Sequence, residues 1–179
     1  MKIPNASSRS RFAPTALAWL ALALPALSAT PVYQVINLGT LGGDLSLAAG
    51  INNAGNIVGV SLDNTGFLQA TLFSSTPGDA GNMNLGSFAG FNGGAAASIN
   101  NTGQMIVGRS SYQGNFSEAR ATLFSAAGGD IGNVDLGTLG GVGSAAININ
   151  NAGQIVGWAS TAGLSERATL FSATPGNGG

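Results

Sequence analysis

The chain has 179 residues, of which 44% are hydrophobic and only 7% are charged, and it contains 29 glycines but neither cysteine nor histidine. This length fits about one domain, and the composition lacks the high charge of disordered chains. It excludes disulfides, thiolate metal sites and catalysis by cysteine or histidine. It favours an all-β fold of short strands joined by glycine turns.

The first 29 residues have the order of a secretory signal peptide. Three of the six basic residues lie in the first eleven positions, the segment 16–24 is apolar, and small residues follow Pro25. This order predicts cleavage after Ser28 or after Ala29. The apolar run is about half as long as a transmembrane helix requires, which makes a membrane anchor the weaker alternative. We therefore expect residues 30–179 to be secreted to the extracellular space, the cell surface or the periplasm.

The charge of this mature chain argues against two classes of partner. Only three basic residues remain, and they are scattered, at Arg109, Arg120 and Arg167. The mature chain therefore has no basic stripe for nucleic acid and no polybasic segment for anionic lipid. We expect neither nucleic-acid binding nor membrane insertion after cleavage.

Three sequence blocks recur in the same order along the mature chain, which defines repeats at 36–82, 83–133 and 134–179. The first block, typified by Leu-Gly-Thr-Leu-Gly-Gly, begins at 38, 85 and 136; the second, Ile-Asn-Asn-x-Gly, at 51, 99 and 149; the third, Ala-Thr-Leu-Phe-Ser, at 70, 121 and 168. The repeats differ in length mainly between the second and third blocks. This segment is predicted to be a surface loop.

Each repeat is predicted to hold four short antiparallel strands. Asn-Asn-x-Gly is a hairpin turn between Ile51 and the strand 56–60, with Gly55, like Gly103 and Gly153, at positive φ. Residues 70–73 form a third strand, and the segment near Leu85 forms a short fourth one. Four strands in about fifty residues is the proportion of a propeller blade. The predicted fold class is an all-β, propeller-like, incomplete or open array; a β-solenoid is the alternative.

The blocks resemble the HAF family of bacterial extracellular repeats. The family pattern is approximately Leu-Gly-x-Leu-Gly-Gly, Ser-x-Ala-x-x-Ile-Asn, Gly-Gln-Val-Val-Gly and then a His-Ala-Phe-Leu-Trp strand. Residues 144–150 and 153–157 match its middle well, whereas Ala-Thr-Leu-Phe-Ser replaces the last strand in all three repeats. The resemblance covers residues 36–179 and implies a secreted repeat protein. A site that depends on the family's histidine would be absent.

Three motifs favour a structural interpretation over a chemical one. Leu-Gly-Thr-Leu-Gly-Gly lacks the glycine order and the lysine of a phosphate-binding loop. The Asn-Asn pairs at 52–53, 100–101 and 150–151 offer amide oxygens for Ca²⁺, but no carboxylate lies in these turns, and we expect each side chain to cap its own turn. Glu118 with Arg120, and Glu166 with Arg167, are interpreted as surface ion pairs.

One position varies within the constant frame of the repeats. It follows Val-Gly and holds Val60, Arg109 and Trp158. Ordinary surface variation is the favoured interpretation; because arginine and tryptophan are frequent binding anchors, an exposed binding face is the alternative. We predict no catalytic, cofactor-binding or metal-binding residues.

The sequence thus predicts a secreted, non-enzymatic repeat protein that acts as an extracellular binding or surface-structural module for a glycan or protein ligand. One alternative is a fragment of a longer repeat protein without independent function. The least favoured is a secreted hydrolase on a propeller scaffold, which would need convergent carboxylates. Three units are fewer than the four to eight blades of closed propellers, so open sheet edges predict self-association.

Overall fold

The computed structural model describes residues 31–171, apart from 89, 103–105 and 113–114. The chain divides into two units, Met1–Gln34 and Val35–Gly179, and every strand belongs to the second. The predicted signal peptide, residues 1–29, lies outside the described residues. No described residue is helical, which confirms the prediction of an all-β fold.

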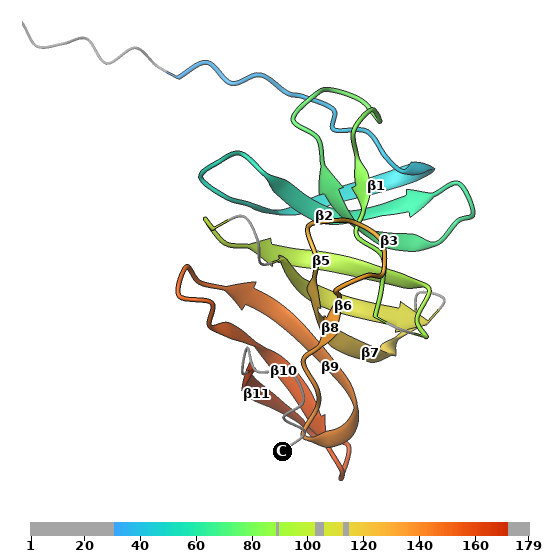
Figure 1. The fold of residues 1–179 in the computed structure, drawn as a ribbon, viewed down its shortest axis with the longest axis vertical. Coiled ribbons are helices and arrows are strands. Elements are labelled where there is room, and N and C mark those ends of the chain that lie inside the picture. Colours follow the sequence, from blue (N-terminus) through green and yellow to red (C-terminus); the bar gives the residue numbers. More distant parts are fainter. Residues whose placement is uncertain (1–30, 89, 103–105, 113–114, 172–179) are drawn as a thin grey trace, which may run out of the picture. The chain divides into compact units, whose positions relative to one another are not determined.

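The strands form three antiparallel sheets that follow one another along the chain (Figure 1). Sheet 1 consists of β1 (Gly42–Ile51), β2 (Ile57–Asp63), β3 (Leu68–Phe73) and β4 (Met83–Asn84). Sheet 2 consists of β5 (Gly93–Ile99), β6 (Ile106–Tyr112), β7 (Asn115–Phe124) and β8 (Val134–Asp135). Sheet 3 consists of β9 (Gly140–Ile149), β10 (Ile155–Thr161) and β11 (Glu166–Phe171). Strands that are consecutive in sequence are neighbours, so each sheet is a meander.

The second and third strands lie close to where the repeat pattern predicts, whereas the first strand is predicted only at Ile51 and spans ten residues in sheet 1. At the Asn-Asn-x-Gly turns, Gly55 and Gly153 have φ values of 81° and 79°, as expected, while Gly103 lies outside the described residues. The fourth strand of sheet 1, however, is formed by the first residues of the second repeat. The boundaries of the sheets therefore differ from those of the sequence repeats, because the last strand of each four-stranded sheet is formed by the first residues of the next repeat.

Part of the extra length of the second repeat lies in a hairpin rather than in the expected loop. β7 spans ten residues, whereas β3 and β11 span six each. The chain from Gly108 to Ala121 is two residues longer than the equivalent chain from Gly59 to Ala70. These two residues extend the β6–β7 hairpin, which an antiparallel pair can accommodate without disturbing the rest of the ladder.

A β-bulge at the same place in all three sheets accounts for the recurring Val-Gly pair. The first strand carries one extra residue opposite this pair, at Ala49, Ala97 and Ile147. A Cβ atom built on Gly59 would overlap the carbonyl oxygen of Leu47 on the neighbouring strand. The same overlap would arise at the equivalent glycines of sheets 2 and 3, at 108 and 157. Only glycine permits this close approach of two backbones.

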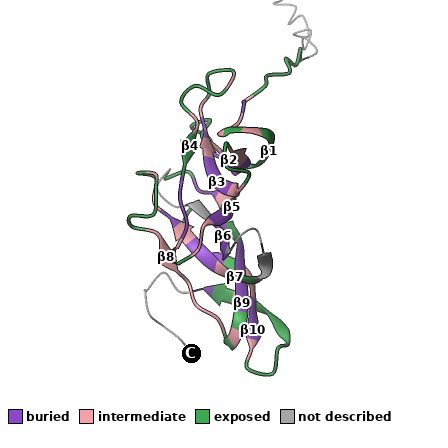
Figure 2. Cartoon of the chain, turned by 90° about the vertical axis from the view of Figure 1, so that its right-hand side faces the viewer, coloured by how far each residue is buried: buried purple, intermediate pink, exposed green. Residues whose placement is uncertain are grey.

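The sheets pack on one another in chain order, and each junction has its own apolar core. The first core joins Val58 and Ala70 of sheet 1 to Ile99 and Phe124 of sheet 2. The second joins sheets 2 and 3 and contains Ala121, Ala146, Ile149, Ile155, Ala159 and Phe171. Buried residues accordingly lie mainly on the strands, whereas most residues of the hairpin turns are exposed (Figure 2). Sheet 2 thus lies between the other two sheets.

Candidate binding groove

A hollow of about 450 Å³ runs across the first strands of the three sheets. Its floor consists of short apolar side chains on these strands, mostly alanines at 48–49, 95–97 and 145–146. Leu47 and Ile147 also line it, and Val60 and Arg109 contribute from the second strands. Three of the lining residues, Ala49, Ala97 and Ile147, occupy the β-bulges described above, so the irregularity that the Val-Gly pairs permit also shapes the groove.

The structure brings two of the three variable positions into this groove. Val60 pairs with Ala70, and Arg109 pairs with Ala121. Because directly paired residues in an antiparallel sheet share one face, both side chains lie on the face that packs toward the next sheet. Trp158 pairs with Ala168 on the equivalent face of sheet 3 and does not line the groove. The predicted exposed face is therefore a half-buried groove at two of the three positions.

Arg109 gives this apolar groove a positive charge. Its side chain is partly buried, and desolvation lowers the pKa of its guanidinium. An arginine titrates so far above neutrality that the group stays charged at physiological pH. A partly desolvated cation attracts an anion more strongly than an exposed one, because the local dielectric constant is lower. The groove therefore suits a ligand that combines apolar groups with one negative charge.

The Asn-Asn turns have the structural role that the sequence predicts. The side-chain oxygen of Asn52 accepts hydrogen bonds from the backbone N–H groups of Ala54 and Asn56, at 3.1 and 2.9 Å. Its amide nitrogen donates to the backbone oxygen of Asn100, in the next sheet, at 3.0 Å. The N–H of Asn53 likewise donates to the side-chain oxygen of Asn101 at 2.7 Å. The asparagines therefore cap their own turns and also link neighbouring sheets.

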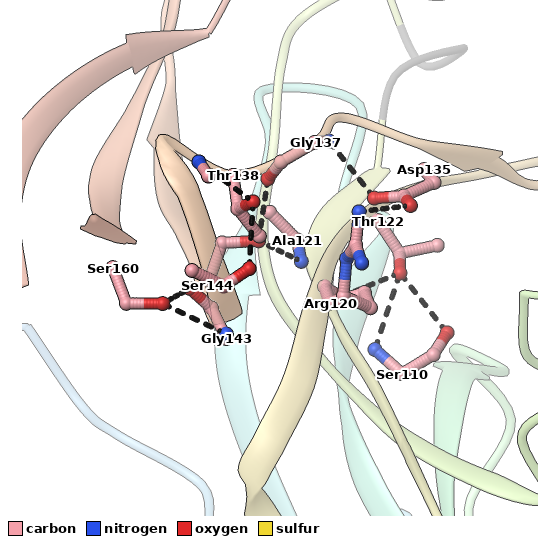
Figure 3. A network of polar contacts seen from close by, with 12 residues as sticks. Ser110, Arg120, Ala121, Thr122, Asp135, Gly137, Thr138, Gly143, Ser144 and Ser160 are labelled. Carbon is pink, nitrogen blue, oxygen red and sulfur yellow. Dashed lines mark hydrogen bonds and ion pairs between the residues drawn. The ribbon is translucent and has the colours of Figure 1, made fainter. Parts of the chain in front are cut away.

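The arginine of the second repeat has a different partner from the one expected. Arg120 pairs with Asp135 of β8 at 2.7 Å, across the strand pair rather than with Glu118 (Figure 3). In the third repeat, Arg167 donates to the backbone oxygen of Glu166 at 2.8 Å. The interpretation of these residues as surface ion pairs within one strand is therefore wrong in its choice of partners.

A buried polar network surrounds this ion pair and continues into sheet 3 (Figure 3). Thr122 donates to the hydroxyl oxygen of Ser110 at 3.0 Å, and the N–H of Ala121 donates to the hydroxyl oxygen of Ser144 at 2.9 Å. Ser144 in turn donates to the backbone oxygen of Gly137 at 2.7 Å. The bond between Ala121 and Ser144 ties sheet 2 to sheet 3, which the repeat pattern alone does not indicate.

Other kinds of site find little support in the described part of the chain. No group of three or more acidic side chains gathers there to hold a metal ion. No helix among the described residues is long and apolar enough to cross a membrane. Comparisons with protein-family models, curated proteins and solved structures give no match.

Proposed function

We propose that this chain is a secreted repeat protein of the HAF type, built from propeller-like blades, that acts as an extracellular binding module. The groove over the first strands carries the proposal, because it combines a constant alanine floor with variable side chains at Val60 and Arg109. A constant frame with a few variable positions is how repeat proteins set specificity on one binding face.

The ligand we propose for the groove is an extended protein segment with apolar side chains and one carboxylate. The short alanine side chains leave room for such a chain to lie across the three first strands. The positive charge of Arg109 favours a carboxylate over a neutral group at this place in the groove. A glycan would instead be held by aromatic stacking and many hydrogen bonds, and none of the described residues that line the groove is aromatic.

A peptide array tests this function on the purified mature protein. Each peptide with one Glu among apolar residues is matched by the same peptide with Gln. We expect the Glu peptides to bind more tightly, and Arg109→Ala to abolish that preference while Arg167→Ala, on an exposed strand, leaves it unchanged. Equal binding of Glu and Gln peptides, or equal effects of the two arginine variants, would exclude the groove as the site.

Export is tested separately by mass spectrometry of the protein recovered outside the cytoplasm. The signal-peptide prediction requires a mature N-terminus at Ala29 or Thr30. An exported chain that retains Met1 on a membrane-bound product would contradict it.

A further inference from the structure

Each junction between neighbouring sheets has two sides, and the two outer faces of the molecule carry one copy of each side. In sheets 1 and 2, one face packs on the sheet that follows. The corresponding face of sheet 3 is called the tail face, and it carries Val156, Trp158, Ala168 and Leu170. In sheets 2 and 3, the opposite face packs on the sheet that precedes. The corresponding face of sheet 1 is called the head face, and it carries Leu38, Ala48, Ile51 and Ile57.

Burial differs sharply between equivalent positions on the tail face and at the internal junctions. Val58 is 0% exposed at the junction of sheets 1 and 2, whereas its equivalent Val156 is 47% exposed. Ala70 and Ala121 are fully buried, whereas Ala168 is exposed. Leu170 is 65% exposed. The tail face thus presents apolar side chains that the same repeat buries elsewhere.

The head face shows the complementary pattern. Ile99 and Ile149 are each 7% exposed because a preceding sheet covers them, whereas Ile51 is 66% exposed. A hollow of about 290 Å³ lies over this face, lined by Leu38, Ile57 and the segment 48–51. Large side chains such as Leu170 and Val156 are of a size to fill such a hollow.

Within the described residues, no strand pairs with the outer edge of β11 in sheet 3, and the chain contains a segment of the right sequence to occupy this edge. β4 pairs with β3 in the register Leu72 with Met83, and β8 pairs with β7 in the register Leu123 with Val134. By alignment of the Asn-Leu-Gly and Asp-Leu-Gly motifs, Ile36 is the equivalent of Met83 and Val134, and Leu170 is the equivalent of Leu72 and Leu123. Ile36 belongs to no strand and is 48% exposed.

This segment already has the conformation that the internal copies adopt. The side-chain oxygen of Asn37 accepts the N–H of Gly39 at 2.9 Å, as that of Asn84 accepts the N–H of Gly86 at 2.7 Å. In sheet 1, the N–H of Leu85 then donates to the backbone oxygen of Ala70 at 2.8 Å. No described residue accepts a hydrogen bond from the equivalent N–H, that of Leu38.

A hydroxyl group on sheet 1 is placed for the same junction. Ser46 donates to the backbone oxygen of Gly39 at 2.7 Å, as Ser144 donates to Gly137. Ser144 uses its oxygen to accept the N–H of Ala121 from the preceding sheet. Ser46 is therefore oriented to accept the N–H of Ala168, the equivalent residue of β11.

We propose that copies of this chain associate head to tail, with the head face of one copy packed on the tail face of another and residues 36–37 added to the edge of β11. The two faces belong to sheets 1 and 3, which sheet 2 separates, so the contact forms between copies rather than within one. The contact is heterologous, and its repetition gives a closed ring or an open filament. It shares Ala48 and Ala49 with the groove, but Ile36, Ile51 and Leu170, which the tests change, do not line the groove.

Disulfide trapping tests the register directly, because the chain has no cysteine of its own. We mix a chain that carries Ile36→Cys with one that carries Leu170→Cys, under mild oxidation. Directly opposed residues in antiparallel strands have Cβ atoms about 5 Å apart, which a disulfide can bridge with a small adjustment. We expect cross-linked dimers from this mixture and none when Ile131→Cys, on an exposed loop, replaces Leu170→Cys. Equal cross-linking in both mixtures would mean unspecific aggregation and would overturn the proposal.

Light scattering coupled to gel filtration measures the association itself, over a wide range of protein concentration. Leu170→Lys and Ile51→Lys each place a charge on one face, and we expect either to weaken association at least about tenfold. Ile131→Lys is the matched control and should leave association unchanged. Because all three side chains are exposed within one copy, none of the variants should impair folding. A wild-type chain that stays monomeric at every concentration, or three variants that behave alike, would refute head-to-tail association.

Discussion

Replacing Asn52 with alanine should destabilise the protein more than the same change at the equivalent Asn150. Asn52 is buried, and its side chain makes three hydrogen bonds, two to its own turn and one to the backbone oxygen of Asn100 in the next sheet. Asn150 makes the same two turn bonds, to Ala152 and Gln154, at 3.0 Å each. Its amide nitrogen, however, donates to the side chain of Gln154 and is exposed.

The difference between the two variants therefore isolates the bond between sheets. At about 1 kcal/mol for each turn bond, and less where water can replace the lost partner, we expect Asn150→Ala to cost about 1 kcal/mol. Asn52→Ala also leaves a buried carbonyl oxygen without its donor, which adds about 1–3 kcal/mol. The expected cost is thus about 2–4 kcal/mol for Asn52→Ala.

Urea unfolding of the two variants, followed by tryptophan fluorescence and analysed by linear extrapolation, gives these free energies. Measurements at low protein concentration keep association between copies from contributing to them. The slope against urea must stay the same in both variants, since a change in slope would indicate a change in the unfolded state. Equal losses of stability in Asn52→Ala and Asn150→Ala would refute the view that the asparagine side chain links the sheets.

Three further predictions rest on single sites. Gly153→Val should lower the free energy of unfolding by about 1 kcal/mol or more, measured in urea, because Gly153 has a φ of 79° and a β-branched residue is strained there. Burial alone would raise the pKa of Asp63, but hydrogen bonds from Thr65, Gln69 and Phe67 outweigh it and lower the pKa. The stability that this carboxylate contributes is therefore present above about pH 4 and is lost as the pH falls through the lowered pKa. Asp63→Asn should make the urea midpoint less dependent on pH in that range. Asn37→Asp should strengthen association in light scattering at low salt and lose the gain at high salt, because it reproduces between copies the ion pair that Arg120 makes with Asp135.

Much of the fold could be predicted from the sequence because local chemistry determines it. Asn-Asn-x-Gly specifies a tight turn through the side-chain acceptor of Asn52 and the positive φ of Gly55. The recurrence of three blocks in constant order then fixed the number of hairpins and the position of the third strand. These features depend on residues close together in the chain, where single-sequence patterns are most informative.

The features that the sequence did not predict depend on contacts between repeats. Nothing near Arg120 in the chain identifies Asp135 as its partner, because the pairing of β7 with β8 brings them together. The extra residue at Ala49 looks like part of a regular strand until β1 is paired with β2. The variable residues Val60 and Arg109 were recognised, but their lining of one groove follows from the packing of successive sheets.

The same packing explains why some positions can vary while others do not. Gly59, Gly108 and Gly157 are fixed because each backbone lies against the carbonyl oxygen of a first strand. The next residue along, Val60 or Arg109, lies beside the alanines of the first strands that line the groove, where there is space in front of the sheet. Since each sheet contacts only its neighbours in the chain, stability is approximately a sum of terms for single sheets and for junctions. Substitutions in the groove therefore alter few of these terms, which lets a ligand site change without loss of the fold.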